Sequence, residues 1–434
     1  MTINTIKSFT VDPFNQFLKK QSSSSIIMLG AMVLAMIIAN SAYAGWYEAL
    51  WKMEVGFTFG ILSLFKPFIY WINDGLMAIF FLMIGLEIKR EVLIGELSSM
   101  RKALLPIIAA LGGAIVPALI YTVINMKNGN LSGWGVPMAT DIAFAIGIMA
   151  MLGDRVPIQL KIFLTSLAVV DDIIAVVVIA LFYTNSIAMS YLMYAGVVIV
   201  ILAIMNIANV KSILVYLIVG LILWYFFLKS GVHATVAGVI LAFFIPSQPR
   251  IPLMTFNKSI GIFMTELKHC TNNPDSEIPT KCQKHIFNKI IHASLSAYNP
   301  MSRLEYNLHG ISAFLIMPIF AFANTGLILS GDAFSGVGSP ISLGIIFGLI
   351  LGKPVGIMLF VLVAEKIKMI TIPEEINRSR LLGAAILSGI GLTMSIFISG
   401  MAFSPEDAQT AKLGILIASL VAGTTGFLFL KAKG

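Results

Sequence analysis

Two adjacent acidic residues, Asp171 and Asp172, stand in the middle of an apolar stretch that runs from Ile158 to Tyr183. A carboxylate at the centre of a bilayer is costly, and where one occurs it usually has a function. Carboxylate oxygens are the ligands that small hard cations prefer, and the same oxygens bind protons. The pair therefore predicts a site where a cation and protons compete for one set of ligands. The alternative is a structural role, in which hydrogen bonds to these acids lock helix packing.

Other polar residues also stand at the centres of apolar segments. Thr140 and Asp141 lie in one segment, Lys353 interrupts another, and a Gly- and Thr-containing stretch at 389–395 interrupts a third. At about 1.5 Å of helical rise per residue, Asp171 lies far from both ends of its own segment, and so also near the centre of the bilayer. All these groups can therefore meet near the midplane of the bilayer.

The charges of these residues match the ends of broken helices. A broken helix exposes N–H groups on one half and carbonyl groups on the other, and Asp141 and Lys353 have the right signs to offset two such ends. We expect Asp171, Asp172 and Thr140 to bind the cation and protons, with Asp172 more exposed and Asp171 closer to Lys353. Lys353 could carry a proton or be a structural counter-charge, and Asp141 could instead fix helix packing.

The composition is that of an integral membrane protein. The 434 residues are 58% apolar and 12% charged, against about 25% charged residues in soluble domains. The net charge of +8 could indicate a nucleic acid partner. Lys and Arg residues nevertheless gather in alternate loops between apolar segments, as the positive-inside rule describes. We therefore expect a lipid bilayer around the chain and no nucleic acid partner.

The same distribution predicts the orientation, with both termini in the cytoplasm. The few basic residues that then fall outside are Lys52, Lys66, Lys127, Lys229 and Lys412. The first apolar run could be mistaken for a secretory signal, but it is long for one and opens a polytopic chain. We interpret it as a retained helix.

The apolar segments predict an all-α polytopic membrane protein with one transmembrane domain at 24–430. Outside the spans we expect a cytoplasmic amphipathic segment at 1–23, an extracellular β-hairpin at 45–68 and a partly helical cytoplasmic loop at 246–309. Twelve segments are candidate transmembrane helices, at 25–42, 70–88, 101–125, 134–152, 158–184, 188–207, 212–228, 231–245, 310–330, 341–365, 380–402 and 411–430.

Two groups of spans, the third to fifth and the tenth to twelfth, run in opposite directions in this topology. Each group contains one span whose centre is loosened by Gly, Pro or Thr. The sequence therefore predicts an inverted repeat with two broken, crossing helices. This pattern marks the binding site of many secondary transporters, the family named below among them.

Two cysteines, Cys270 and Cys282, lie in the loop at 246–309. A disulfide is not expected in a reducing cytoplasm. The nearby His269 and His285 leave zinc as an alternative, but the chain lacks a paired C-x-x-C. His233, in another segment, is expected to be a packed histidine rather than a ligand.

The motifs closely resemble those of the bacterial Na+/H+ antiporter A (NhaA) family, in order and over about residues 20–430. The matching stretches are Ile72-Asn73-Asp74-Gly75-Leu76-Met77-Ala78, Gly85-Leu86-Glu87-Ile88-Lys89-Arg90-Glu91, Ala139-Thr140-Asp141-Ile142-Ala143-Phe144, Val170-Asp171-Asp172, Gly231-Val232-His233-Ala234-Thr235, Phe320-Ala321-Phe322-Ala323-Asn324, Gly352-Lys353-Pro354 and Gly391-Leu392-Thr393-Met394-Ser395.

This resemblance implies an electrogenic antiporter in the bacterial inner membrane that exchanges cytoplasmic Na+ or Li+ for a larger number of protons. It implies that Asp171 and Asp172 bind the cation and protons, and that the segment at 45–68 joins two copies in a homodimer. It also implies activation at alkaline pH through a cytoplasmic cluster, and the matching residues are Glu87, Arg90, Glu91, Arg303, Glu305 and His309. Tyr306 replaces a histidine of the family pattern, which puts the pH threshold in doubt.

Two other classes of protein, a channel and a protease, fit the sequence less well. A passive cation channel would not need a buried lysine beside the acids, and no filter sequence is repeated. An intramembrane aspartyl protease would need two separate catalytic aspartates, one after Gly-x-Gly, and the nearest sequence, at 151–154, lacks the first glycine. We therefore expect a transporter of Na+, Li+ and protons, without enzymatic activity and without a cofactor.

Overall fold

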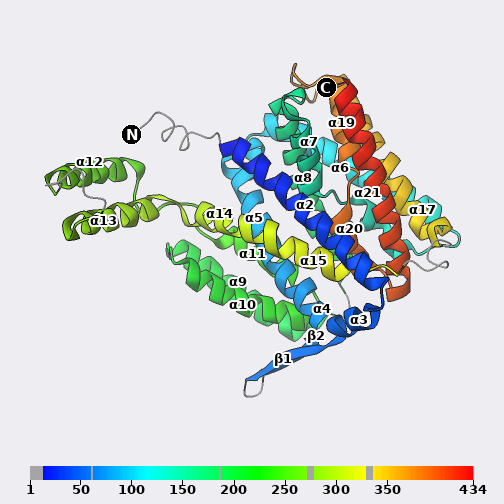
Figure 1. Cartoon of the computed structure of the whole chain (residues 1–434), viewed down its shortest axis with the longest axis horizontal. Coiled ribbons are helices and arrows are strands. Elements are labelled where there is room, and N and C mark those ends of the chain that lie inside the picture. Colours follow the sequence, from blue (N-terminus) through cyan, green and yellow to red (C-terminus); the bar gives the residue numbers. More distant parts are fainter. Residues whose placement is uncertain (1–12, 60–61, 185–186, 271–277, 329–335, 434) are drawn as a thin grey trace.

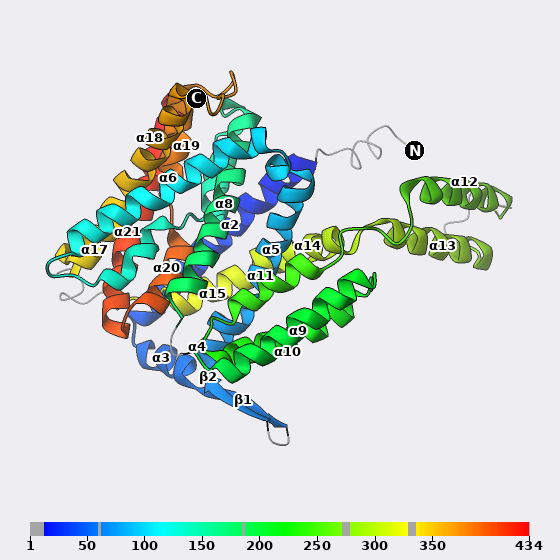
Figure 2. The same cartoon turned by 180° about the vertical axis from the view of Figure 1, so that it is seen from behind.

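The computed structural model describes residues 13–59, 62–184, 187–270, 278–328 and 336–433. A bundle of helices forms most of it, and a two-stranded hairpin lies at the end of the bundle opposite the C-terminus (Figures 1 and 2). Two further helices project sideways from the bundle in both views.

The first part of the chain contains the hairpin. Strands β1 (Glu54–Phe59) and β2 (Leu62–Pro67) pair antiparallel, with Glu54 opposite Pro67. A hairpin is thus confirmed at 54–67, whereas the first part of the predicted segment at 45–68 forms a short helix instead. The predicted segment at 1–23 lies partly outside the described residues, and its remainder continues into the first helix without a break. The helices of this part are α2 (Pro13–Ala39), α3 (Ala44–Lys52), α4 (Phe68–Tyr70), η1 (Trp71–Leu76), α5 (Met77–Ile94), η2 (Glu96–Ser98) and α6 (Met100–Asn125).

The middle of the chain begins with a helix that stops and restarts. The two pieces are η3 (Leu131–Met138) and α7 (Ile142–Met151), so one predicted break lies at 139–141. The elements that follow are η4 (Gly153–Arg155), α8 (Ile158–Phe182), α9 (Met189–Ile207), α10 (Ile213–Ser230) and α11 (Thr235–Phe244).

The predicted loop at 246–309 contains a pair of helices, α12 (Leu253–His269) and α13 (Lys281–Ala297), which we call the insert. Its outer end is joined by a disulfide between Cys270 and Cys282, with 5.9 Å between their Cα atoms. The expectation that these cysteines stay unpaired was therefore wrong for this structure, because the antiparallel helices bring them together. The loop also ends earlier than predicted, because the next span begins at Pro300.

The last part of the chain contains a second broken helix. Its two pieces, α19 (Arg378–Leu387) and α20 (Leu392–Ala402), meet at an angle of 48°. Lys353, in contrast, does not lie at a break, because a π-helical turn keeps its span continuous. The other elements are α14 (Pro300–Ile311), η5 (Ser312–Ile316), α15 (Met317–Asn324), η6 (Gly336–Gly338), α17 (Pro340–Phe347), η7 (Gly348–Gly352), α18 (Lys353–Lys366) and α21 (Pro405–Lys433).

Within the described residues, nine helices are long and apolar enough to cross a membrane, or up to eleven if each of two bent pairs counts as one span. The predicted span at 231–245 corresponds to Thr235–Phe244, which has 10 residues and is too short to cross by itself. In the apolar stretch of α8, the helix that carries Asp171 and Asp172, 72% of the residues are buried inside the protein. In the corresponding stretch of α9 the share is 17%. The acids therefore lie on the innermost of these spans.

Glycines allow close helix contacts around these acids. A Cβ atom on Gly112 of α6 would collide with the backbone carbonyl of Gly356 on α18, and the reverse is equally true. Small residues let the backbones of membrane helices approach closely. This contact holds α18, which begins with Lys353, against α6.

Candidate cation and proton site

The centre of the site is an ion pair that is closed to solvent. Lys353 Nζ lies 2.6 Å from Asp171 Oδ2, and the two side chains are 0% and 1% exposed. The Thr140 hydroxyl lies 2.7 Å from the same carboxylate oxygen. Asp171 Oδ1, the other oxygen, is buried without a hydrogen-bond partner among the described residues. The structure thus pairs Lys353 with Asp171, the acid that the sequence analysis placed closer to it.

Asp141 connects the two broken helices. Its Oδ1 accepts from the backbone N–H of Phe144 at 3.3 Å and caps α7. Its Oδ2 accepts from the backbone N–H and the hydroxyl of Thr393, at 3.0 and 2.5 Å, in the first turn of α20. The positive ends of two helices therefore face one carboxylate, which stabilises its negative charge. Hydrogen bonds occupy both oxygens of Asp141.

The two breaks touch each other. The backbone N–H of Asp141 donates to the carbonyl of Ile390 at 2.6 Å, and the Thr140 hydroxyl lies 2.8 Å from the carbonyl of Ser388. A Cβ atom on Gly391 would collide with the Ser395 hydroxyl and approach the carbonyl of Ala139. Backbone groups freed from one helix are therefore satisfied by the other, as a membrane interior requires.

Asp172 differs from its neighbour. It is 4% exposed, and it makes no hydrogen bond or ion pair with the residues that the structure describes. Its side chain lines a cavity of about 60 Å³, which is large enough for a water molecule or a small cation. The cavity wall also contains Thr140, so one hydroxyl links the cavity to the ion pair of Asp171. Other polar groups in the wall are Ser24, Glu87, Asp141, His309, Ser312 and Thr393.

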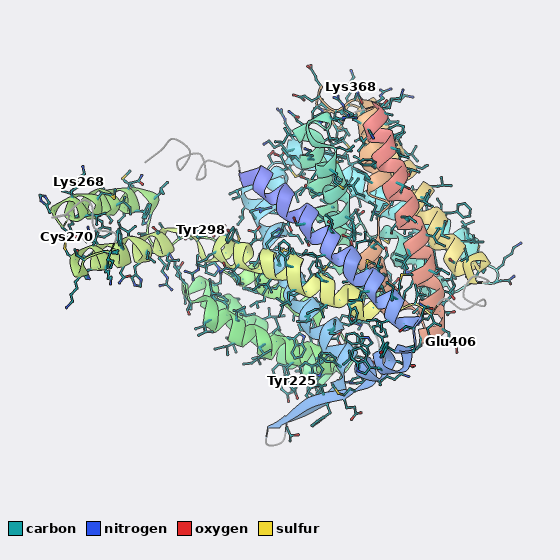
Figure 3. All side chains as sticks on the ribbon, viewed as in Figure 1. Tyr225, Lys268, Cys270, Tyr298, Lys368 and Glu406 are labelled. Atoms are coloured by element: carbon teal, nitrogen blue, oxygen red, sulfur yellow. A yellow bond between two sulfur atoms is a disulfide. The ribbon has the colours of Figure 1, made fainter. Side chains whose placement is uncertain are left out.

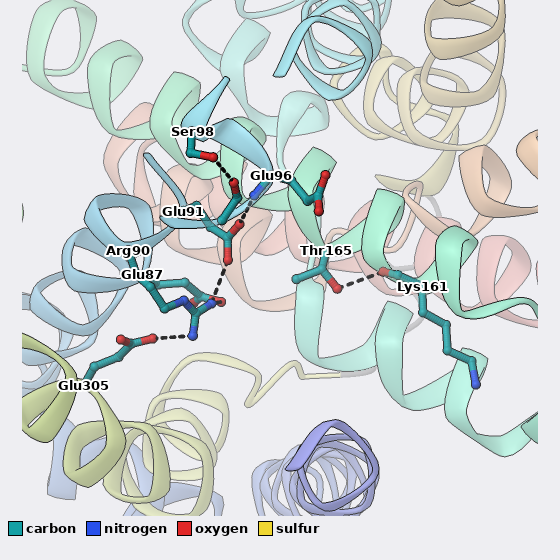
Figure 4. Close-up of polar contacts among 9 residues, drawn as sticks. Glu87, Arg90, Glu91, Glu96, Ser98, Lys161, Thr165 and Glu305 are labelled. Carbon is teal, nitrogen blue, oxygen red and sulfur yellow. Dashed lines mark hydrogen bonds and ion pairs between the residues drawn. The ribbon is translucent and has the colours of Figure 1, made fainter. Parts of the chain in front are cut away.

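Four of the six residues matched to the pH-sensing cluster lie together where α5 meets α14. The Arg90 guanidinium lies 2.7 Å from Glu305, 2.9 Å from Glu91 and 3.7 Å from Glu87 (Figure 4). We call these residues the Arg90 cluster. Glu87 also lines the cavity of Asp172, so the cluster and the cavity share a side chain.

The other two matched residues lie apart from the Arg90 cluster. Arg303 of α14 forms no ion pair within the described ranges. His309, nearly two turns further along, lies in the cavity wall with Asp172. His233 lies just before α11, within the predicted span at 231–245, and its ring nitrogen is 2.9 Å from the carbonyl of Tyr183, as expected for a packed histidine.

Thr393 and Ser388 were not predicted as site residues. Thr393 donates twice to Asp141, and Ser388 offers its carbonyl to Thr140. The available signal was the interruption at 389–395, but the sequence could not show which of its groups faces the other break. Within the described residues, no group of three or more His, Cys, Asp or Glu residues is arranged to hold a metal ion.

A buried acidic cavity at the contact of two broken helices, inside a bundle of membrane spans, defines the class of ion-transporting membrane proteins. Comparison with known proteins gives the particular family. The sequence model of the Na+/H+ antiporter 1 family matches residues 15–430, and the chain belongs to this family.

Curated relatives agree over nearly their whole lengths. The Na(+)/H(+) antiporter NhaA of Oleidesulfovibrio alaskensis is 44% identical over 96% of this chain and 93% of its own length. The NhaA of Helicobacter pylori strain HPAG1 is 46% identical over 96% of the chain and 94% of its own. The NhaA of Citrobacter koseri is 43% identical, over 96% and 98%.

A solved structure of the sodium proton antiporter MjNhaP1 from Methanocaldococcus jannaschii at pH 8 also aligns with the chain. It covers 94% of this chain and 99% of its own, at 12% identity and a TM-score of 0.42. At this score the alignment supports no conclusion.

Proposed function

We propose that this chain is a secondary antiporter that exchanges cytoplasmic Na+ or Li+ for external protons. One observation carries the proposal: Asp172 presents an unbonded carboxylate to a cavity, directly beside an ion pair of Asp171 and Lys353. Family membership and the curated relatives support Na+ and protons as the transported ions. A passive channel is not favoured, because the buried ammonium of Lys353 would repel a cation in an open pore.

The proposed exchange uses the same oxygens in two states. With protons bound, Asp172 is neutral and Lys353 keeps its contact with Asp171. A cation that enters the cavity binds the ionised carboxylate of Asp172 and the hydroxyl oxygen of Thr140. It also draws Asp171 away from Lys353, and Asp171 Oδ1 then becomes a ligand. The proton of Asp172 leaves as the cation binds, and Lys353, once Asp171 has left it, releases a second proton. Release of two protons for one cation makes the exchange electrogenic.

The proposed transport cycle alternates access between the two sides of the membrane. Spans 3–5 correspond to α6, η3 with α7, and α8, whereas spans 10–12 correspond to α17 with α18, α19 with α20, and α21. The middle member of each group is broken, and the breaks touch. This supports an inverted repeat, and we propose twelve crossings, one of them formed by the short α11 together with the residues that flank it. The chain would then lie in a bacterial inner membrane with both termini on the cytoplasmic side.

We propose that the Arg90 cluster adjusts transport to pH. Glu87 belongs both to this cluster and to the cavity wall, so protonation on the cytoplasmic side can change the charge that a cation meets. Activation at alkaline pH follows, because carboxylates that lose protons attract cations. Arg303 would act through the electrostatic effect of its own charge on the Arg90 cluster rather than through a direct contact.

We also propose a homodimer joined through the hairpin at 45–68. A two-stranded sheet leaves both outer edges unpaired, and such edges readily pair with another chain. Two aromatic residues of this segment, Trp46 and Phe65, are 58% and 55% exposed in the single chain.

Inside-out membrane vesicles with an acid interior test the proposed exchange. Addition of Na+ or Li+ should collapse the pH gradient in vesicles with the unaltered chain, and Asp172→Asn should prevent this. Glu365→Gln, a change of the same type at a surface ion pair with Arg378, should not. Sodium entry without proton movement would support a channel instead. No response at acid or alkaline pH would exclude the antiporter.

A further inference from the structure

The insert has one apolar face and an opposite, mainly polar face, on which Ile262 of α12 is an exposed apolar residue. Residues two apart on a helix are rotated by about 200°. Glu266 of α12 and Lys289 of α13 form an ion pair at 3.1 Å, which marks one side of the helix pair. Met264 and Phe287 each lie two residues earlier and therefore point to the opposite side.

Further apolar side chains extend this opposite side. Leu253 lies three helical turns before Met264, and Ile291 lies one turn after Phe287. We call these four residues the apolar face. They are 68%, 49%, 41% and 53% exposed in the order Leu253, Met264, Phe287 and Ile291, although such side chains are normally buried.

Basic residues border the apolar face. Lys268 lies one turn beyond Met264, and Lys284 lies almost one turn before Phe287. Among the described residues of the two helices, Lys258, Lys268, Lys281, Lys284 and Lys289 carry positive charge, and Glu266 carries the only negative charge. An apolar stripe with a basic border is typical of helices that lie in a membrane interface. The positive charge complements anionic lipid headgroups.

The base of the insert lies where the short helix α11 ends and a candidate span begins. The backbone N–H of Met301, at the start of the span Pro300–Asn324, donates to the carbonyl of Pro246, just after α11. The backbone N–H groups of Arg250 and Ile251 donate to the carbonyl of Ser296 and hold together the two chain segments that form the base. Figure 3 shows the helices extending from this base, with Lys268 and Cys270 at the far end. Each helix has 17 residues and is about 25 Å long.

We propose that the insert binds the surface of the membrane in which the chain is embedded, with the apolar face in the interface and the bordering lysines on anionic headgroups. The lysine stems allow their ammonium groups to reach the headgroups while the aliphatic carbons cover apolar surface. The proposal concerns the leaflet next to the base of the insert and does not depend on the transported ion.

Tryptophan fluorescence in nanodiscs tests this proposal on the full-length protein. Phe287→Trp places a tryptophan on the apolar face, and His285→Trp, two residues earlier on the same helix, places the matched control on the polar face. The nanodiscs contain one protomer each, phosphatidylglycerol, and phosphatidylcholine brominated on its acyl chains. Emission of the unaltered protein, which has 5 tryptophans, is subtracted.

Bromine should quench the emission added by Phe287→Trp about twofold or more and leave that of His285→Trp nearly unchanged, because only the first lies at acyl-chain depth. Quenching should weaken when phosphatidylglycerol is replaced by phosphatidylcholine and when salt is raised. Ile291→Trp repeats the test if Phe287→Trp folds poorly. Equal quenching of both faces, or none at the apolar face, would overturn the proposal. A blue shift that needs two protomers in one disc would assign the face to a second copy instead.

Discussion

Carboxylates contact a basic side chain in two regions of the molecule, the ion pair of Lys353 with Asp171 and the Arg90 cluster. The two regions differ in their surroundings. Lys353 and Asp171 are closed to solvent, whereas Arg90 is 35% exposed and contacts three carboxylates. A buried charge that loses its partner has no water to replace it, and removal of one partner costs about 3–5 kcal/mol. An ion pair in contact with solvent contributes about 1 kcal/mol or less.

This difference separates two tasks. In the proposed function, the buried pair switches between two partners, a lysine and a cation, because each alternative alone satisfies the charge of Asp171. The Arg90 cluster would exchange protons with water and change its charge gradually as protons leave. A cation-binding site and a pH-responsive region can thus be built from carboxylates and basic residues whose main difference is burial.

The largest effect is expected from Asp172→Asn. An amide has no negative charge with which to bind a cation, and it cannot bind and release a proton at this site. Transport should therefore be lost at every pH. Proton release on addition of Na+ to purified protein in detergent measures this directly. Glu305→Gln should keep proton release near that of the unaltered chain. Equal loss in both variants would mean that the two regions do not differ in task.

The second prediction concerns the stability of the buried pair. Lys353→Met leaves Asp171 without its partner and should lower the free energy of unfolding by about 3 kcal/mol if the carboxylate stays ionised. Asp171→Asn in the same chain removes that charge and should restore most of the loss, so the two changes should be strongly non-additive. Thermal unfolding of both single variants and the double variant measures the coupling. Additive losses would contradict a direct pair.

The apolar segments, the hairpin and both breaks could be predicted from sequence, because hydropathy, Gly, Pro and mid-span charges act within a short stretch of chain. The place of Lys353 could not be predicted as easily. The Gly and Pro residues that flank it suggested a break, but the span stays helical through a π turn packed against α6. Hydropathy also could not separate a crossing helix from the 10-residue α11.

The site was predicted where chemistry depends on residue type, and missed where it depends on backbone. Asp141, Asp171 and Lys353 could be named because charges in an apolar segment are costly. The carbonyl of Ser388 is chemically the same as any other, and only the crossing of the two breaks brings it to Thr140. The disulfide of the insert was missed because the expected compartment, rather than the distance between the cysteines, guided the expectation.

The third prediction tests whether Thr140 belongs to the cation site. Thr140→Val keeps the shape and removes the oxygen that lies 2.7 Å from Asp171, so Na+ should activate transport with about tenfold lower affinity, as expected for about 1.5 kcal/mol of lost interaction. Thr165→Val is the control, because this hydroxyl donates to the carbonyl of Lys161 in its own helix at 2.9 Å (Figure 4). Concentrations of Na+ for half-maximal response should differ between the two variants.

The smallest change in stability is expected in the Arg90 cluster. Glu305→Gln removes one of three carboxylates around Arg90 and should lower the free energy of unfolding by less than Lys353→Met does, because Arg90 keeps two carboxylate partners. Arg90→Gln should cost more, because Glu87, Glu91 and Glu305 would then face one another without a positive charge. The same three carboxylates would hold protons more readily, and activation should therefore move toward alkaline pH in Arg90→Gln and in the opposite direction, if at all, in Glu305→Gln. Transport measured across pH, with the maximal rate fitted separately, distinguishes this shift from a general loss of activity. A reduced maximal rate with an unmoved pH profile would show that the Arg90 cluster only holds α5 against α14.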